Sequence, residues 1–192
     1  YMKIGLFFGS FNPIHIGHLA MANYFAEFTD LERIWLVISP QSPFKTKKNL
    51  LAEHHRYYMA QMALEDDMQI SPTNIEFHLP KPSYTIDTLT YLTEKYPQHR
   101  FNLILGSDNL TYLNKWKNFD DLIQQYSIYV YPRPEVDPME YTEKYKFKIV
   151  NAPLIEISSS FIRNSIKDGK DVRYFLPAKV YEYLKDMHFY EK

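Results

Sequence analysis

The sequence predicts a doubly wound α/β fold with a mostly parallel sheet, folded as a single domain. Five short apolar runs recur along the 192 residues, and segments with helical periodicity separate most of them. The first run, residues 4–8, has no polar alternation, which is typical of a strand buried on both faces of a parallel sheet. Runs of this kind that alternate with helices indicate a sheet covered by helical layers.

The order of the elements follows from these runs. We expect strands at residues 4–8, 34–38, 101–105, 127–131 and 147–150. Helices are expected at 18–28, which is rich in Ala and free of Gly and Pro, at 52–64, and from about 85, 107, 159 and 177 onward. The Pro-rich stretch 132–138 is interpreted as a surface excursion between two strands. Residues 158–192 form a short helical segment that completes the single domain 1–192.

Composition limits the classes of function. Hydrophobic residues make up 45% of the chain, which is enough for a core without covalent staples. The absence of Cys excludes a disulfide framework and a thiol nucleophile, and favours a cytoplasmic location. A net charge of −1 offers no general basic surface for nucleic acid, and no apolar run approaches the roughly 20 residues of a membrane helix. We therefore expect any anionic ligand to be a small molecule. The sequence leaves open whether the protein forms a homo-oligomer.

The turn at residues 9–18 is the strongest functional signal. It joins the first strand to the next helix, at the sheet edge where open parallel sheets bind ligands. Gly9 allows close approach of a ligand, and the unpaired N–H groups of the helix start attract phosphate. His15 and His18 flank this site as hydrogen-bond donors for phosphoryl oxygens. Either His alone is readily explained as a cap or a surface residue, but the pair favours function.

Other segments bring polar groups to helix starts. Ser83 or Thr85 can cap the helix that begins near residue 85, and residues 155–157 are interpreted as the end of a strand before the helix that begins near residue 159. Ser159, Ser160 and Arg163 gather hydroxyl and guanidinium donors at one helix start, which predicts a polyphosphate clamp, although serines before a helix are commonly caps. Lys45 lies on a basic loop that can reach the anion site. Trp116 is an apolar residue between polar neighbours, which is unusual for a surface position. It either has a functional role or packs against Phe119.

These motifs resemble a known family. The turn reads Gly-Ser-Phe-Asn-Pro-Ile and then His-x-Gly-His, which is similar to the signature of the class I nucleotidyltransferases, and in particular of the bacterial nicotinate mononucleotide adenylyltransferases. The bacterial pattern carries Gly, Thr and Asp where this chain has Phe8, Ser10 and Asn12. Residues 84–89, Tyr-Thr-Ile-Asp-Thr-Leu, and residues 157–163, Ile-Ser-Ser-Ser-Phe-Ile-Arg, extend the resemblance over almost the whole chain.

The resemblance implies a Rossmann-like nucleotidyltransferase fold and an adenylyl transfer. ATP would react with the 5′-phosphate of nicotinate mononucleotide to give deamido-NAD and pyrophosphate, in NAD biosynthesis. The attacking phosphate is already anionic, so catalysis reduces to placement and charge stabilisation. Mg²⁺ would be held mainly through ATP phosphates and water, without protein ligands.

The resemblance also implies roles for individual residues. The catalytic set is His15, His18, Lys45 and Arg163. The ATP-binding set is Gly9, Ser10, Phe11, His15, His18, Gly106, Asp108, Ile157, Ser159, Ser160 and Arg163. The mononucleotide-binding set is Asn12, Lys45, Arg56, Tyr84, Thr85, Trp116 and Lys117. Within it, Trp116 would stack on the pyridine ring, and N–H groups near Thr85 would meet the carboxylate.

Three alternatives remain open. His-Ile-Gly-His is also the signature of class I aminoacyl-tRNA synthetases, but this chain is short, lacks a Lys-Met-Ser-Lys-Ser element and has no net positive charge. Pantetheine-phosphate adenylyltransferase is the nearest competitor within the transferases, and it should lack the motif at 84–89 and Trp116. A nucleotide sensor that binds without turnover belongs to another class, and pyrophosphate release distinguishes it.

Overall fold

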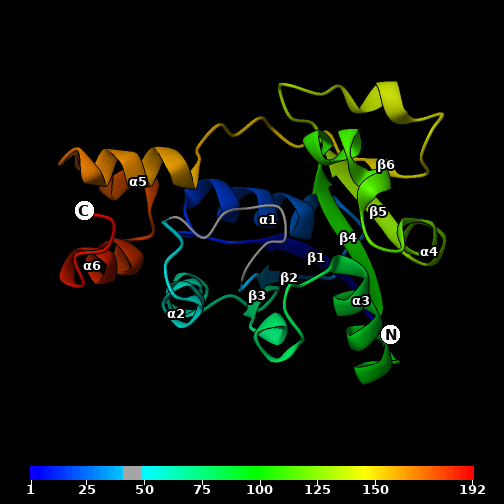
Figure 1. Cartoon of the computed structure of the whole chain (residues 1–192), viewed down its shortest axis with the longest axis horizontal. Helices are drawn as coiled ribbons and strands as arrows, with labels where there is room; N and C mark the ends of the chain where they lie inside the picture. Colours follow the sequence, from blue (N-terminus) through cyan, green and yellow to red (C-terminus); the bar gives the residue numbers. More distant parts are fainter. Residues whose placement is uncertain (41–48) are drawn as a thin grey trace.

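A computed structural model describes residues 1–40 and 49–192 as a parallel sheet between helical layers (Figure 1). Within these residues the sheet has six strands in the order β3-β2-β1-β4-β5-β6, and each strand runs parallel to its neighbours. The strands are β1 (Lys3–Gly9), β2 (Arg33–Ile38), β3 (Ile70–Thr73), β4 (Arg100–Gly106), β5 (Ser127–Tyr131) and β6 (Lys148–Ile149). The predicted doubly wound, mostly parallel sheet is confirmed.

Helices cover both faces of this sheet. They are α1 (Ile16–Phe28), α2 (Glu53–Ala63), α3 (Thr85–Lys95), α4 (Phe119–Gln125), α5 (Ser159–Lys167) and α6 (Ala178–Asp186). Side chains of α1, α2, α5 and α6 share one hydrophobic core with one face, and those of α3 and α4 share a second core with the other. Phe7 joins the first core while Ile4 and Leu6 join the second, so β1 is buried on both faces as its sequence predicts.

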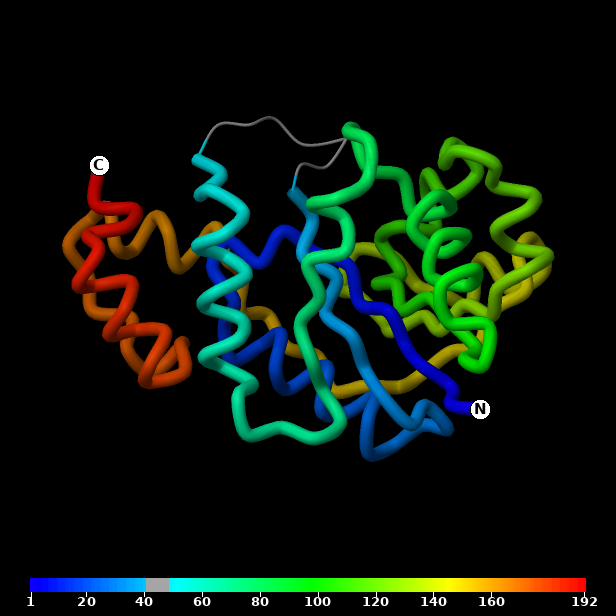
Figure 2. Tube along the Cα trace, turned by 90° about the horizontal axis from the view of Figure 1, so that it is seen from below, coloured from blue at the N-terminus to red at the C-terminus, as the bar shows by residue number. Residues whose placement is uncertain are grey.

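The C-terminal helices pack at one end of the molecule. Figure 2 shows α6 beside α2, at the end opposite α3 and α4. The hydroxyl of Tyr183 on α6 lies 2.8 Å from Nδ1 of His55 on α2. Phe189, beyond α6, packs its ring against the same imidazole. The end of the chain is therefore fixed to α2 by polar and aromatic contacts.

One strand was missed, and two expectations for local structure were wrong. The missed strand is β3, which tolerates the absent N–H of Pro72 because it lies at the edge of the sheet. Residues 155–157 do not form a strand. Neither Ser83 nor Thr85 caps α3, because Tyr84 occupies the cap position and its side chain makes no cap hydrogen bond.

The strand order places a crevice at the centre of the sheet. The connections change direction between the neighbours β1 and β4, and in open sheets ligands bind outside the carboxyl ends of the strands at such a point. β1 ends at Gly9 and β4 ends at Gly106.

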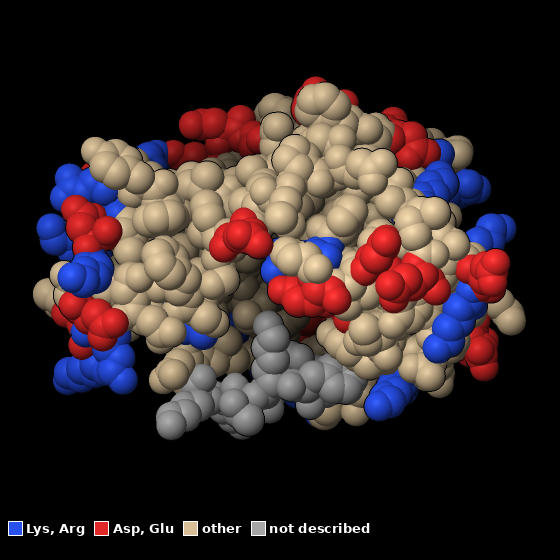
Figure 3. Space-filling view, turned by 90° about the horizontal axis from the view of Figure 1, so that it is seen from above, with Lys and Arg blue, Asp and Glu red and all other residues tan. Residues whose placement is uncertain are grey.

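Among the described residues no helix has the length and hydropathy needed to cross a membrane. Figure 3 shows Lys and Arg mixed with Asp and Glu along the edges of one face.

Candidate active site

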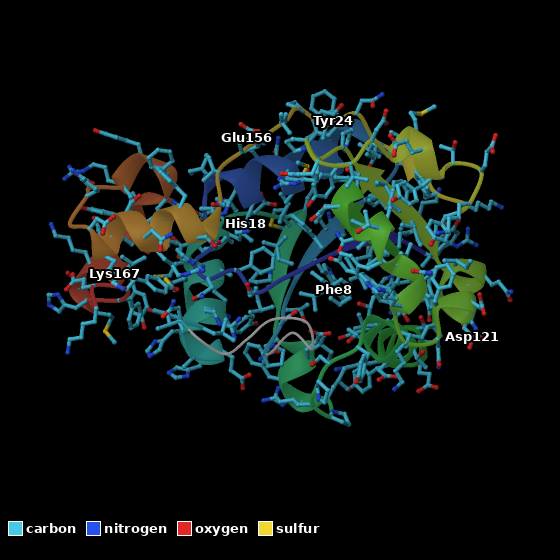
Figure 4. All side chains as sticks on the ribbon, turned by 45° about the horizontal axis from the view of Figure 1, so that its top comes forward. Phe8, His18, Tyr24, Asp121, Glu156 and Lys167 are labelled. Carbon is cyan, nitrogen blue, oxygen red and sulfur yellow. The ribbon has the colours of Figure 1, made fainter. Side chains whose placement is uncertain are left out.

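A cavity of about 460 Å³ opens at this crevice. Figure 4 shows Phe8 and His18 near the middle of the molecule, with α5 on one side and the end of β4 on the other. The cavity is lined by most of the predicted ATP-binding residues: Gly9, Ser10, Phe11, His15, His18, Asp108, Ile157, Ser159, Ser160 and Arg163. Segments from three parts of the sequence therefore meet at one place.

His15 and His18 form a reciprocal cap at the start of α1. The backbone N–H of His18 donates to Nδ1 of His15 at 3.3 Å, and the backbone N–H of His15 donates to Nδ1 of His18 at 3.2 Å. The two rings are stacked, with centroids 3.6 Å apart. Because each Nδ1 accepts a hydrogen bond, the proton of each neutral ring lies on Nε2. The backbone thus fixes both imidazoles as Nε2–H donors.

Burial keeps His15 uncharged. Only 3% of its surface is exposed, and this desolvation lowers the pKa of His15 from 6.5 to about 4. At neutral pH it is therefore a neutral hydrogen-bond donor. Its Nε2–H can donate to a phosphoryl oxygen on which charge develops, with no change in its own protonation state.

This pKa predicts a pH dependence of stability. Between pH 6.5 and about 4 the unfolded chain protonates His15 while the folded protein does not, so stability falls as the pH falls through this window. The loss is on the order of 3 kcal/mol, at 1.36 kcal/mol per pKa unit. We expect the free energy of unfolding in urea to decrease less between pH 7 and pH 4.5 in His15→Ser, which keeps a cap but does not titrate. Equal slopes in the two proteins would contradict the assignment.

Tight packing shapes the turn before α1. Phe11 adopts a left-handed conformation with φ of 46°, and its ring lies against Phe7 and His18 with centroids 6.0 and 4.7 Å away. A Cβ at Gly17 would lie 2.9 Å from the His15 ring, so no side chain fits there without displacing the imidazole. Gly17 is therefore needed for this close approach of the imidazole to the helix start.

Helix α5 brings its N-terminus to the same turn. Ser158 caps the helix by accepting from the N–H of Phe161 at 3.1 Å. The hydroxyl of Ser159 donates to the Pro13 carbonyl at 2.9 Å. Arg163 donates through Nη1 to the Asn12 carbonyl at 2.8 Å and through Nη2 to the Ser160 hydroxyl at 3.2 Å. Two helix N-termini, those of α1 and α5, therefore face the cavity with an Arg between them, which favours an anionic ligand.

The end of β4 supplies the carboxylate of the cavity. A Cβ at Gly106 would lie 2.6 Å from Oδ1 of Asp108, so the glycine makes room for this exposed side chain. Sequence reasoning missed Ser39 and Arg133, which also line the cavity. Arg133 lies in the stretch that we interpreted as a surface excursion. Its position just after β5, at the carboxyl edge of the sheet, was the signal that could have found it.

Arg56 corrects one expectation. Its side chain is 0% exposed, and four of its N–H groups donate to main-chain carbonyls: Leu51 at 2.7 Å, Ser10 at 2.6 Å, Ser39 at 2.7 Å and Pro40 at 3.2 Å. Direct binding of the mononucleotide by Arg56 is therefore wrong for this structure. The guanidinium instead ties together the turn after β1, the end of β2 and the segment before α2.

Asn12, a predicted mononucleotide-binding residue, has a side chain that is engaged by the protein itself. It lines the cavity but is only 4% exposed, and its side-chain amide bonds to the protein. Nδ2 donates to the Asn49 carbonyl at 2.8 Å, while Oδ1 accepts from the Leu51 N–H at 3.2 Å and from the Tyr190 hydroxyl at 2.5 Å. Both acceptor positions of the oxygen are filled, so the amide positions the turn.

The remaining mononucleotide-binding candidates lie in a separate group at the start of α3. Lys117 Nζ is 2.8 Å from Asp87 Oδ2 and 4.9 Å from the Tyr84 ring centroid. Trp116 is half-buried and, like Phe119, packs against the second core. Tyr84, Thr85, Trp116 and Lys117 do not line the 460 Å³ cavity. Lys45 lies outside the described residues.

The described residues offer donors that suit a polyphosphate more than a metal ion. Within 1–40 and 49–192, no group of three or more His, Asp or Glu side chains is placed to hold a metal. The cavity instead combines imidazoles, hydroxyls, two Arg residues and one carboxylate. Such a donor set fits a divalent cation that arrives on nucleotide phosphates and keeps its water ligands.

Comparison with known proteins agrees with this geometry. Residues 6–165 match the family model described as Cytidylyltransferase-like. A curated relative from Flavobacterium johnsoniae, named "Probable nicotinate-nucleotide adenylyltransferase", is 51% identical over 100% of both chains. A relative of the same name from Cytophaga hutchinsonii is 49% identical over 98% of both chains.

A solved structure has a similar fold. The chain resembles a Plasmodium falciparum nicotinic acid mononucleotide adenylyltransferase complexed with NaAD, with a TM-score of 0.84, 22% identity, and coverage of 100% of this chain and 98% of that chain. At this identity the likeness concerns the fold alone. The Cytidylyltransferase-like match and the relatives about half identical over nearly their full lengths show that this chain belongs to the nicotinate-nucleotide adenylyltransferase family.

Proposed function

We propose that this protein transfers the adenylyl group of ATP to the 5′-phosphate of nicotinate mononucleotide, giving deamido-NAD and pyrophosphate in NAD biosynthesis. The observation that carries the proposal is the meeting of two helix N-termini, the His15–His18 pair and Arg163 at one cavity. Two curated relatives carry the corresponding name, and the Plasmodium falciparum protein was solved with NaAD.

In the proposed reaction, an oxygen of the mononucleotide phosphate attacks the α-phosphorus of ATP. The bond from that phosphorus to the bridging oxygen breaks, and pyrophosphate leaves with the electron pair. No proton has to be removed from the nucleophile, so the protein contributes placement and charge stabilisation. Mg²⁺ carried by the phosphates would neutralise part of their charge.

Each cavity residue has a proposed part in this reaction. His15 donates from Nε2 to the α-phosphate, where charge develops, and His18 and Arg163 hold the leaving phosphates. Ser159 acts through its backbone N–H, because its hydroxyl is bonded to Pro13. Asp108 accepts hydrogen bonds from ribose hydroxyls. Lys45 stays in the proposal on its family resemblance alone.

Pyrophosphate release tests the proposal directly. We expect release from ATP with nicotinate mononucleotide, together with a product of the mass of deamido-NAD. ATP binding without pyrophosphate release, whether nicotinate mononucleotide or phosphopantetheine is the acceptor, would identify a nucleotide sensor. Release with phosphopantetheine but not with the mononucleotide would identify the competing transferase.

We also expect a preference for nicotinate over nicotinamide mononucleotide. No side chain of the described residues caps α3, and although the Asp87 N–H donates to the Tyr84 carbonyl at 3.1 Å, those of Thr85 and Ile86 remain as donors for a carboxylate. An amide would turn its NH₂ toward these donors, a mismatch of about 1–3 kcal/mol or roughly tenfold to a hundredfold in kcat/KM. The ratio of kcat/KM values at one Mg²⁺ concentration measures this, and a ratio at or below one would overturn it.

Lys117 should contribute little to that preference. Its ammonium is paired with Asp87, and both side chains are more than 40% exposed. A pair of this kind contributes about 0–1 kcal/mol. We expect Lys117→Met to change the acid-to-amide ratio by no more than about threefold.

A further inference from the structure

The last residues of the described chain return to the active-site turn. Figure 1 shows the C-terminus between α5 and α6, close to the start of α2. There the Tyr190 hydroxyl donates to Oδ1 of Asn12 at 2.5 Å, across a sequence separation of 178 residues. This contact joins the tail to the loop that precedes α1, not merely to the helices on which the tail packs.

Asn12 passes this contact on to the cavity. The same side chain holds the Asn49 carbonyl and the Leu51 N–H, and the main-chain carbonyl of Asn12 accepts from Nη1 of Arg163 at 2.8 Å. Arg163 lines the cavity, whereas Tyr190 does not. Any effect of Tyr190 on a bound nucleotide therefore acts through Asn12 and Arg163.

The surroundings of Tyr190 keep its hydroxyl a donor. Burial raises the pKa of Tyr190, although the nearby Arg56 and Arg163 oppose this rise. The phenol is therefore protonated throughout the pH range of an enzyme assay. The guanidinium groups of Arg56 and Arg163 lie near the same ring. They donate to the Ser10 and Asn12 carbonyls of the turn.

The tail adopts a backbone that costs free energy. His188 and Tyr190 have φ values of 56° and 66°, in the left-handed region that residues other than Gly rarely adopt. Such conformations persist only where the surroundings determine them. Phe189 between them packs on His55 and Tyr183, which leaves the Tyr190 ring directed to the turn.

We propose that Tyr190 is a positioning residue for adenylyl transfer, which fixes Asn12 and, through the Asn12 carbonyl, the guanidinium of Arg163. This role rests on the function proposed above. Tyr190 touches no reacting atom, and the inference assigns it orientation of the turn. A tail that only anchored α6 would need no hydroxyl at this position, since Tyr183 and Phe189 already hold it to α2.

Tyr190→Phe tests this with a matched control. The change removes one hydroxyl and keeps the ring, and Tyr183→Phe does the same where the hydroxyl meets His55, away from the cavity. We expect Tyr190→Phe to lower kcat about three- to tenfold, the value of one hydrogen bond, with both KM values within about twofold of wild type. Tyr183→Phe should keep kcat within about twofold. Equal kcat values for Tyr190→Phe and wild type, or equal losses in the two variants, would overturn the proposal.

A double-mutant cycle tests the route through Asn12. If Tyr190 acts through that side chain, Tyr190→Phe should have little further effect on kcat in an Asn12→Ala background. Additive losses in the two variants would overturn this route.

Hydrogen exchange separates this proposal from the function on which it rests. Backbone amides of residues 10–15 should exchange faster in Tyr190→Phe than in wild type or Tyr183→Phe. Unchanged exchange would overturn the positioning role, whether or not the enzyme is active. Faster exchange in a protein that releases no pyrophosphate would support the positioning of the turn and contradict the adenylyl transfer.

Discussion

His15→Ser should lower kcat by about 10²–10³-fold, the loss expected for one donor to developing charge. Serine is a favourable N-cap, so it replaces the cap that His15 gives α1, but its hydroxyl is too short to take the place of Nε2. The KM for the mononucleotide should stay within about threefold, because the lost contact forms mainly in the transition state. Steady-state kinetics with both substrates measures this split.

His18 provides the companion test. Each of the two rings accepts the other residue's N–H, so removal of either changes the support of its partner. We expect His18→Ala to lower kcat as well, and the double variant to lose less than the product of the single losses. Near-normal turnover in both single variants would contradict the proposed mechanism.

Arg56→Met should cause the largest loss of stability, about 3–5 kcal/mol in the free energy of unfolding. Methionine fills the space but leaves four buried carbonyls of three segments without their donor, and each unpaired group costs about 1–3 kcal/mol before relaxation. Arg56→Lys should recover only part of the loss, since an ammonium lacks the planar fork of the guanidinium. Urea unfolding at pH 7 measures all three proteins.

Arg173→Met is the control for this experiment. Arg173 pairs with Asp171, but its side chain is 49% exposed, and solvent screens such surface pairs so that they contribute little to stability. If Arg56→Met destabilises the protein no more than Arg173→Met does, the hydrogen bonds from Arg56 to the four main-chain carbonyls contribute nothing measurable to stability.

The sequence predicted the sheet well because its signal is local. All five predicted strands begin and end within one residue of β1, β2, β4, β5 and β6, and the central ones were recognised because a strand buried on both faces needs an unbroken apolar run. β3 was missed because four residues with a Pro carry almost no such signal, and its place at the sheet edge depends on its neighbour β2.

The site was predictable to the extent that it follows strand ends and helix starts. His15, Asp108 and Arg163 were found because each occupies such a position in a recognisable motif. Arg56 was misassigned, and the protein contacts of Asn12 were missed, because their partners are carbonyls and a hydroxyl from distant segments, which no local pattern reveals. A cation near an anion site looks the same in sequence whether it faces the ligand or supports the loop beneath.

The contact between Asn12 and Tyr190 also bears on the order in which the molecule matures during synthesis. During synthesis the turn with His15 and His18 emerges from the ribosome long before residue 190 is made, because 178 positions separate Asn12 from Tyr190. Closing so long a loop is entropically costly and is deferred until the helices around it have docked. Newly made protein should thus gain its sheet and helices first and full turnover afterwards, a lag that pulse-labelled activity measurements can resolve.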